Sequence, residues 1–207
     1  MLPIISALII SYLLGSIPTA YIFGRVAKGV DIRKFGSGNV GATNALRVLG
    51  RKAGIAVLLI DVLKGFSAVV FLGSLPFIRS TASGAQTLRI LLGLACVAGH
   101  IWTVFLRFRG GKGMATSLGV FMGLAFSDAG IRIAVAFSVL VWFLVFIFSH
   151  IISLASVAAA IALPLLMLAC KLPVLPLAIS FLISLIVVLR HKSNLIRLLE
   201  GKEKRIW

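Results

Sequence analysis

Residues 36–47 form the segment whose residue types are best suited to chemistry. The segment holds three glycines, four small polar residues and one arginine: Gly36, Ser37, Gly38, Asn39, Gly41, Thr43, Asn44 and Arg47. Glycines let the backbone turn sharply and approach a ligand closely. The neutral side chains supply hydrogen-bond donors and acceptors, and the planar guanidinium of Arg47 suits a phosphate or a carboxylate. This composition predicts an anion-binding segment.

The glycine spacing of this segment also matches G-x-G-x-x-G, the dinucleotide fingerprint. That motif has meaning only after a strand and inside a βαβ unit. Here it follows the short polar stretch 31–35 and, before that, a long apolar run. A dinucleotide site is therefore not expected.

A second glycine-rich basic turn lies at residues 107–113 and includes Arg109 and Lys112. It lacks the Gly-Lys-Ser/Thr ending of a P-loop, so it does not indicate a nucleotide site. Glycine amides and cations at the start of a helix favour an anion. The alternative for Arg107 and Arg109 is that they only pin the turn to the membrane surface.

The basic segment 190–203 follows the last apolar run. His191, Asn194 and Arg197 recur at three-residue spacing, which places them on one helical face. The segment is therefore either a topology anchor or a wall of the site.

Two charged residues and one histidine interrupt apolar runs. Asp61 and Lys64 share a helix face and should pair with each other or face the interior, because charges at membrane depth are costly. We favour a structural pair over a part of the polar site. His100 lies just before the second glycine turn, and a core role and a site role remain equally open for it.

No group of residues has metal-ligand spacing or a Ser-His-Asp arrangement. The acidic residues outside the apolar runs, on the basic side of the chain, are Asp31, Glu200 and Glu203. An enzyme built from this chain would therefore need no carboxylate base. It should bind anionic substrates and use an already activated donor.

The elements that must position these residues are membrane helices. The 207 residues are 60% hydrophobic and only 13% charged, with a mean hydropathy of +1.14. Soluble domains have about 25% charged residues, so a polytopic all-α membrane protein is predicted. The net charge of +16 is explained by the positive-inside rule before nucleic acid need be invoked, and no nucleic-acid partner is expected.

A span needs about 20 apolar residues, or about 17 at the least. Seven spans are predicted, over residues 2–24, 53–77, 87–106, 114–126, 131–148, from the turn at 149–150 to about 170, and from the turn at 171–173 to about 189. Small residues at 15–19 should kink the first span or let it pack closely, and residues 25–52 should form a polar loop. A Ser/Gly-rich loop should follow residue 77.

Charge then orients the seven spans. One side of the layout holds 16 of the 21 Lys and Arg residues, the other side holds 4, and Lys64 lies within a span. The basic side is therefore expected to be cytoplasmic, with the amino terminus outside and the carboxyl terminus inside. No repeat or composition break divides the chain, so residues 1–207 are expected to form one domain.

The segments described above carry a resemblance that covers nearly the whole chain. Its motifs are Asp31-Ile32-Arg33, GSGNxGATNxxR at 36–47, Asp61-x-x-Lys64-Gly65, Gly99-His100, FRGGKGxAT at 108–116, SLAS at 153–156 and Arg190-His191-x-x-Asn194. In this order they resemble the bacterial acyl-phosphate:glycerol-3-phosphate acyltransferases, the PlsY family. Thr103 stands where that family usually has proline, and Arg109 stands where it commonly has lysine.

The resemblance implies a multi-pass enzyme of the bacterial cytoplasmic (inner) membrane, with seven helices and a site at the cytoplasmic face. It would transfer a fatty acyl group from acyl phosphate to the 1-hydroxyl of glycerol 3-phosphate. The products would be 1-acylglycerol 3-phosphate and phosphate, in phospholipid synthesis. No cofactor or metal is implied; the partners would be the two substrates, membrane lipid and, as an open question, an enzyme that makes the donor.

The resemblance also implies roles for individual residues. Ser37, His100 and Asn194 would be the catalytic candidates, with His100, His191 and Asn194 positioning the glycerol hydroxyl or the acyl carbonyl. The substrate-binding candidates would be Ser37, Asn39, Thr43, Arg47, Arg109, Lys112, Ser153, Ser156 and His191. Phosphate is a good leaving group that can itself accept a proton, so attack could be substrate-assisted, with His100 as the alternative base.

A transporter for an organic phosphate is the main rival class. It too would place cations near a seven-helix bundle. However, secondary transporters bind near mid-membrane and have repeated halves, whereas here the polar residues gather on one side and no two halves repeat.

Overall fold

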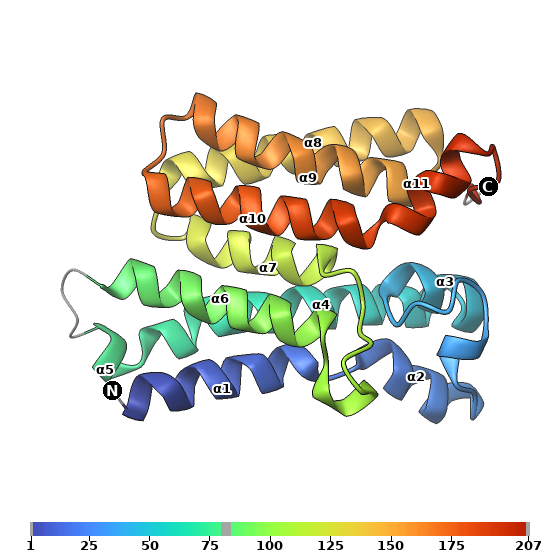
Figure 1. Ribbon diagram of the computed structural model, residues 1–207, viewed down its shortest axis with the longest axis horizontal. Coiled ribbons are helices and arrows are strands. Elements are labelled where there is room, and N and C mark those ends of the chain that lie inside the picture. Colours follow the sequence, from blue (N-terminus) through green and yellow to red (C-terminus); the bar gives the residue numbers. More distant parts are fainter. Residues whose placement is uncertain (1, 80–83, 206–207) are drawn as a thin grey trace. The chain divides into compact units, whose positions relative to one another are not determined.

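The computed structural model describes residues 2–79 and 84–205, and every regular element within these ranges is helical. The α-helices are α1 Leu2–Ser16, α2 Thr19–Lys28, α3 Ala42–Leu49, α4 Arg51–Val70, α5 Pro76–Arg79, α6 Ala85–Ile101, α7 Met114–Ala125, α8 Ala129–Ser149, α9 Ile152–Ala169, α10 Val174–Arg190 and α11 Lys192–Leu199 (Figure 1). Short 3₁₀ helices lie at Ile32–Lys34 (η1), Leu72–Ser74 (η2) and Val104–Leu106 (η3). Helices are expected here because apolar segments in lipid must satisfy their backbone groups internally.

Four helical segments in the described ranges are long and apolar enough to cross a membrane: Arg51–Ser74, Ala85–Leu106, Ala129–Ser149 and Ile152–Ala169. Two further pairs, α1 with α2 and α10 with α11, are bent by 41° and 55° and raise the number to 6 if each pair counts as one span. The short α7 matches the short fourth run expected from the sequence. The chain is therefore a helical membrane protein, while seven spans and their orientation stay predictions.

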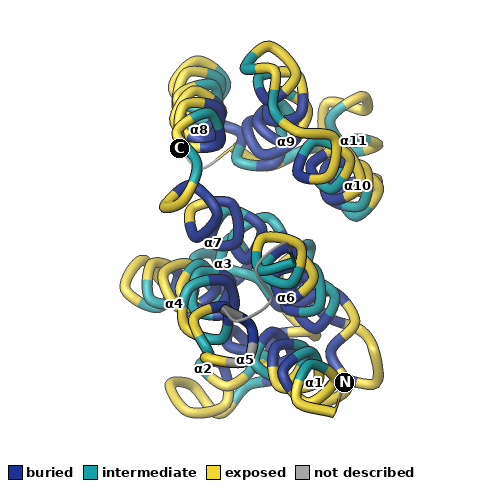
Figure 2. Tube along the Cα trace, turned by 90° about the vertical axis from the view of Figure 1, so that its left-hand side faces the viewer, coloured by how far each residue is buried: buried dark blue, intermediate teal, exposed yellow. Residues whose placement is uncertain are grey.

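The chain divides into two compact units, Met1–Gly123 and Leu124–Trp207. The boundary falls in the last turn of α7. Each unit has helices that are buried toward their neighbours within the unit and that carry exposed residues as well (Figure 2). The expectation of one functional domain over residues 1–207 stays a prediction.

In the first unit, α1 packs along α6. A Cβ atom on Gly15 would overlap the carbonyl of Cys96, and one on Gly99 would overlap the carbonyl of Tyr12, so the two backbones are nearly in contact. Small residues allow this close packing in membranes. The chain then breaks at Pro18, which precedes α2. The prediction that this patch of small residues kinks the first span or lets it pack closely is confirmed, because both features are present.

The polar loop predicted over residues 25–52 is partly wrong. Residues 42–49 form α3, and α4 begins directly afterwards at Arg51. α3 is amphipathic and buries Asn44 and Ala45, a pattern that the glycine-rich residues before it obscured. Residues 80–83, most of the predicted Ser/Gly-rich loop, and residues 206–207 of the tail lie outside the described residues.

In the second unit, α9 packs against both α8 and α10. Buried serine hydroxyls connect these helices: Ser138 Oγ donates to the carbonyl of Ala159 at 2.9 Å, and Ser184 Oγ donates to the carbonyl of Ala160 at 2.5 Å. α11 contacts α9 and α10. This places the tail helix beside the start of α9, where Ser153 lies.

Candidate functional site

Asn44 organises the opening segment from within. Its side-chain oxygen accepts from the backbone amide of Ser37 at 2.9 Å. Its Nδ2 donates to the carbonyls of Ile32 and Phe35 at 3.2 and 3.1 Å. Gly36 has a φ of +61°, and a Cβ there would overlap Asn44 Oδ1. Asn44, which the sequence placed among the ligand-facing polar residues, is thus a buried structural residue.

Asp31 begins the turn that leads into this segment. It caps η1 by accepting from the amide of Arg33 at 3.1 Å, and Arg33 Nη2 lies 2.7 Å from its other oxygen. The guanidinium of Arg25 lies 3.7 Å away. Hydrogen bonds from Arg33 lower the pKa of Asp31, and the carboxylate raises the pKa of Arg33. Asp31 therefore serves the local structure as an ionised carboxylate.

The ligand candidates of the opening segment lie around α3. Ser37 is exposed and Asn39 is half-buried. Gly41 precedes α3 in an extended conformation, Thr43 lies in the first turn of the helix, and Arg47 lies in its last turn. The amino-terminal end of α3, with its backbone amides, thus lies at the glycine segment. The guanidinium of Arg47 lies about one helical turn beyond Thr43.

The second glycine turn folds back on the end of α6. The amide of Gly111 donates to the carbonyl of His100, and the amide of Gly110 donates to the carbonyl of Ile101, both at 3.0 Å. A Cβ on Gly111 would overlap His100 Nε2, so only glycine fits against the imidazole. Arg109 is exposed and Lys112 is half-buried. The structure therefore brings His100 to the turn that carries both cations.

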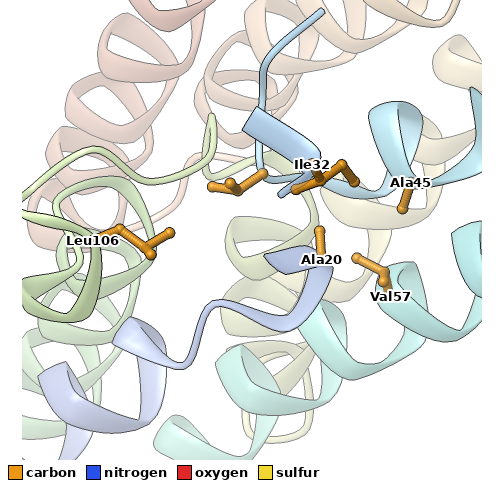
Figure 3. Close-up of a cluster of buried hydrophobic side chains, with 6 residues drawn as sticks. Ala20, Ile32, Ala45, Val57 and Leu106 are labelled. Carbon is orange, nitrogen blue, oxygen red and sulfur yellow. The ribbon is translucent and has the colours of Figure 1, made fainter. Parts of the chain in front are cut away.

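A buried cluster joins the two glycine segments. It contains six residues: Ala20, Ile32, Val40, Ala45, Val57 and Leu106. Ile32, Val40 and Ala45 flank or belong to the opening segment, whereas Leu106 immediately precedes the second turn (Figure 3). The same packing thus fixes both anion-binding candidates in the first unit.

Asp61 and Lys64 form the pair that their spacing predicted. Lys64 Nζ lies 2.9 Å from Asp61 Oδ1, and both side chains are nearly inaccessible to solvent. His100 Nδ1 lies 3.8 Å from the same carboxylate oxygen. The predicted pairing is therefore confirmed, and the pair also borders one of the predicted site residues, His100.

In the second unit, Glu203 gathers two of the predicted site residues. Its Oε1 accepts from Ser153 Oγ at 2.8 Å and from Asn194 Nδ2 at 2.6 Å. Arg197 Nε donates to its Oε2 at 2.8 Å. Burial raises the pKa of Glu203, but the hydrogen bonds from Asn194, Ser153 and Arg197 outweigh it, so the pKa lies below its ordinary value.

Sequence reasoning missed the role of Glu203. Its signal was its rarity, because the chain has only 5 acidic residues against 21 basic ones. An acid so outnumbered will find cationic or hydrogen-bonding partners. Which partners it finds depends on how the tail folds back, and local sequence does not reveal that.

Ser156 and His191 lie elsewhere in the second unit. Ser156 Oγ accepts from the indole of Trp142 at 3.3 Å. His191 Nδ1 lies 2.7 Å from the carbonyl of Val187, and a carbonyl can only accept, so Nδ1 carries the proton. Both residues are buried. Among the described residues no three His, Cys, Asp or Glu side chains are grouped so that they could hold a metal ion.

By fold and side-chain chemistry, this is a helical membrane protein with cation-bearing glycine turns suited to an anionic ligand. The sequence model of the family described as "Glycerol-3-phosphate acyltransferase" matches residues 5–201. The chain belongs to this family of integral membrane acyltransferases of phospholipid synthesis.

Individual relatives agree with the family. The chain is 42% identical over 204 residues to a glycerol-3-phosphate acyltransferase of Prochlorococcus marinus, covering 96% of this chain and 92% of that one. It is 42% identical over 200 residues to glycerol-3-phosphate acyltransferase 2 of Moorella thermoacetica, covering 97% and 96%.

Two crystal structures of PlsY, an integral membrane glycerol 3-phosphate acyltransferase, are also similar. The glycerol 3-phosphate form has a TM-score of 0.84 at 38% identity and covers 99% of this chain and 96% of that chain. The lysophosphatidic acid form has a TM-score of 0.82 at 38% identity and covers 99% and 95%.

Proposed function

We propose that the chain transfers a fatty acyl group from acyl phosphate to the 1-hydroxyl of glycerol 3-phosphate. The hydroxyl oxygen attacks the acyl carbonyl carbon, the bond from that carbon to the phosphate oxygen breaks, and the hydroxyl proton leaves with the phosphate. The products are 1-acylglycerol 3-phosphate and inorganic phosphate. Acyl phosphate is already activated, so the chemistry needs no cofactor or metal.

The observation that carries the proposal is the shared packing of the two glycine segments. Both substrates contain a phosphate, and the cluster around Ile32 and Leu106 supports two segments rich in amides and cations. Charge-assisted hydrogen bonds from arginine and lysine are the strongest contacts available to a phosphate. The glycerol 3-phosphate and lysophosphatidic acid forms of PlsY contain the acceptor and product that the proposal assigns to this chain.

The proposal assigns phosphate binding in the first unit to four residues, with Arg109 assisting: Ser37, Asn39, Arg47 and Lys112. Thr43 adds a polar contact at the start of α3. His100 orients the glycerol hydroxyl or the acyl carbonyl. In the second unit, His191 and Asn194 share the orienting role, and Ser153 and Ser156 contact substrate. Ser37, His100 and Asn194 are the catalytic residues of this scheme.

The state of the acidic residues favours substrate-assisted attack. Asp31 is bound to Arg33 and Glu203 is bound to Arg197, and the pKa of each of these two carboxyl groups lies below its ordinary value. Carboxylates held ionised by cations are weak bases, so the phosphate of the donor is the better proton acceptor. His100 is the alternative base. General base catalysis contributes about 10²–10⁴-fold, so a His100→Gln variant that loses only about tenfold would support substrate assistance.

In the membrane, the proposal places residues 1–207 as one functional domain with seven spans, the short α7 being one of them. The amino terminus lies outside, and both glycine segments lie at the cytoplasmic face of a bacterial inner membrane. The acyl tail then lies among apolar helices while the phosphate stays at the interface. A soluble enzyme that makes the acyl phosphate would deliver it to this face.

The direct test is phosphate release from palmitoyl phosphate by the purified protein in detergent, with and without glycerol 3-phosphate. Release should require glycerol 3-phosphate. Arg47→Ala should lower kcat/KM about 10- to 100-fold, since a hydrogen bond to a charged group contributes about 1.5–3 kcal/mol. Arg51→Ala, an exposed arginine at the start of α4, is the matched control and should leave the rate unchanged.

Folded protein that releases no phosphate would contradict the proposal. In that case transport of an organic phosphate becomes the better explanation of the same cations. Equal losses in the Arg47→Ala and Arg51→Ala variants would contradict only the phosphate-binding role of Arg47 and would leave the proposed reaction standing.

A further inference from the structure

A buried polar network lies behind the second glycine turn. Asp61 is 1% exposed and Lys64 is 5% exposed. Asp61 Oδ1 accepts from Thr19 Oγ1 at 3.0 Å and lies 2.9 Å from Lys64 Nζ. Lys64 Nζ also donates to the carbonyl of Ile17 at 3.0 Å. The network therefore connects α4 to the break between α1 and α2.

Such a network is costly to bury. Two charges removed from water lose hydration that their attraction only partly repays, and ionisable residues within membrane helices are typically functional. A structural link alone could be made by the uncharged hydroxyls that connect other helices of this chain, such as Ser11 Oγ to the carbonyl of Leu92 at 2.6 Å. The charge of Asp61 therefore calls for a further explanation.

The explanation is a third residue that lies near the same carboxylate oxygen, Asp61 Oδ1. His100 is 7% exposed, and its Nδ1 lies 3.8 Å from Asp61 Oδ1. This is too long for a hydrogen bond but close enough for the negative carboxylate to favour a proton on the nearer ring nitrogen, Nδ1. The opposite edge of the ring, at Nε2, lies against Gly111. The imidazole is thus placed between a fixed carboxylate and the turn that carries Lys112.

We propose that Asp61 is a positioning residue that acts through His100, and the inference rests on the function proposed above. The carboxylate favours the imidazole tautomer with the proton on Nδ1. That tautomer leaves Nε2, on the ring edge that lies against Gly111, without a proton. Thr19 and Lys64 hold the carboxylate in place, so the ring has one orientation. The orientation of the ring in turn sets the position of the turn that meets a substrate phosphate.

A double-mutant cycle tests this inference. The variants are Asp61→Asn, which keeps the shape and one acceptor oxygen but removes the charge, His100→Gln, and the two combined. Ser11→Ala is the matched control, because it removes a buried hydrogen bond between α1 and α6 about eight residues, or roughly 12 Å, along α6 from His100. For each variant, kcat and KM for glycerol 3-phosphate and palmitoyl phosphate are measured together with the temperature of unfolding.

Asp61→Asn should lower kcat/KM about 10- to 100-fold, because a small misplacement of a site group can cost that much. The double variant should be no slower than His100→Gln alone, since Asp61 would have nothing left to position. Ser11→Ala should lower the temperature of unfolding while its kinetic constants stay those of the original protein.

Losses that multiply in the double variant, or wild-type kinetics in Asp61→Asn, would overturn the inference. So would a loss in Ser11→Ala as large as that in Asp61→Asn. If Asp61→Asn does not fold, Thr19→Val takes its place in the same cycle and is judged by the same criteria. An unmodified protein that shows no acyl transfer would instead refute the proposed function, so the two failures are distinguishable.

Discussion

The hydroxyl of Thr103 satisfies a backbone group at the end of α1. Thr103 Oγ1 donates to the carbonyl of Ser16 at 2.5 Å, and both residues are buried. The φ of Thr103 is −66°, which suits the proline that the family resemblance leads us to expect at this position. The preceding Trp102 has a ψ of +60°, however, outside the range that proline favours in the residue before it. At this position the chain therefore has a threonine hydroxyl that binds the carbonyl of Ser16, in place of a proline ring that would restrict the backbone.

Thr103→Val should destabilise the protein by about 1–3 kcal/mol, because it leaves the buried carbonyl of Ser16 without its donor. Thr103→Pro should lose the same bond and also strain Trp102. The measurement is the free energy of unfolding in detergent. Ser6→Ala removes an exposed hydroxyl that donates to a carbonyl within α1 and is the control. Equal stability of Thr103→Val and the original protein would show that another donor replaces the hydroxyl.

At the scale of elements, the tail helix α11 is held by a residue that follows it. Glu203 lies beyond the end of α11 and contacts Asn194 and Arg197 within it, as well as Ser153 near the start of α9. One carboxylate thus fixes the helix against its neighbour. The bend of 55° between α10 and α11 turns the tail so that these contacts can form.

The lowered pKa of Glu203 predicts how the tail responds to pH. A carboxyl group with a lowered pKa in the folded state stabilises that state above its ordinary pKa, and the contribution is lost as the pH falls below about 4.3. Amide exchange in residues 192–203 should therefore lose protection in acid before the rest of the second unit does.

The Glu203→Gln variant tests whether the carboxylate of Glu203 causes this response to pH. In this variant the tail should be less protected at neutral pH and should not respond further to acid. Glu200→Gln removes an exposed carboxylate paired with Lys202 and should behave like the original protein. Unchanged protection in Glu203→Gln would mean that apolar packing alone holds α11.

For the whole molecule, charge predicts the orientation in the membrane. With Cys96 and Cys170 replaced by alanine, Lys204→Cys should react with a membrane-impermeant maleimide only after cells are permeabilised. Ser127→Cys should react in intact cells, because it lies on the side with few cations. The reverse pattern would refute the predicted orientation.

Local sequence was enough to establish the class of the chain. The length and hydropathy of the runs predicted helices in a membrane, the proline and small residues near Pro18 predicted the break after α1, and the shortness of the run at 114–126 predicted α7. These properties depend on neighbouring residues only. The composition of residues 36–47 likewise indicated an anion-binding segment. The order of the motifs along the whole chain indicated the family.

Only the tertiary structure decided what individual polar residues do. Asn44 proved to be internal support, Asp61 to border His100, and Glu203 to bind residues of α9 and α11. Each of these outcomes rests on contacts between residues far apart in the chain, and spacing along one helix carries no information about them. The type of a residue therefore limits the interactions that it can make, and the tertiary structure determines which residues are its partners.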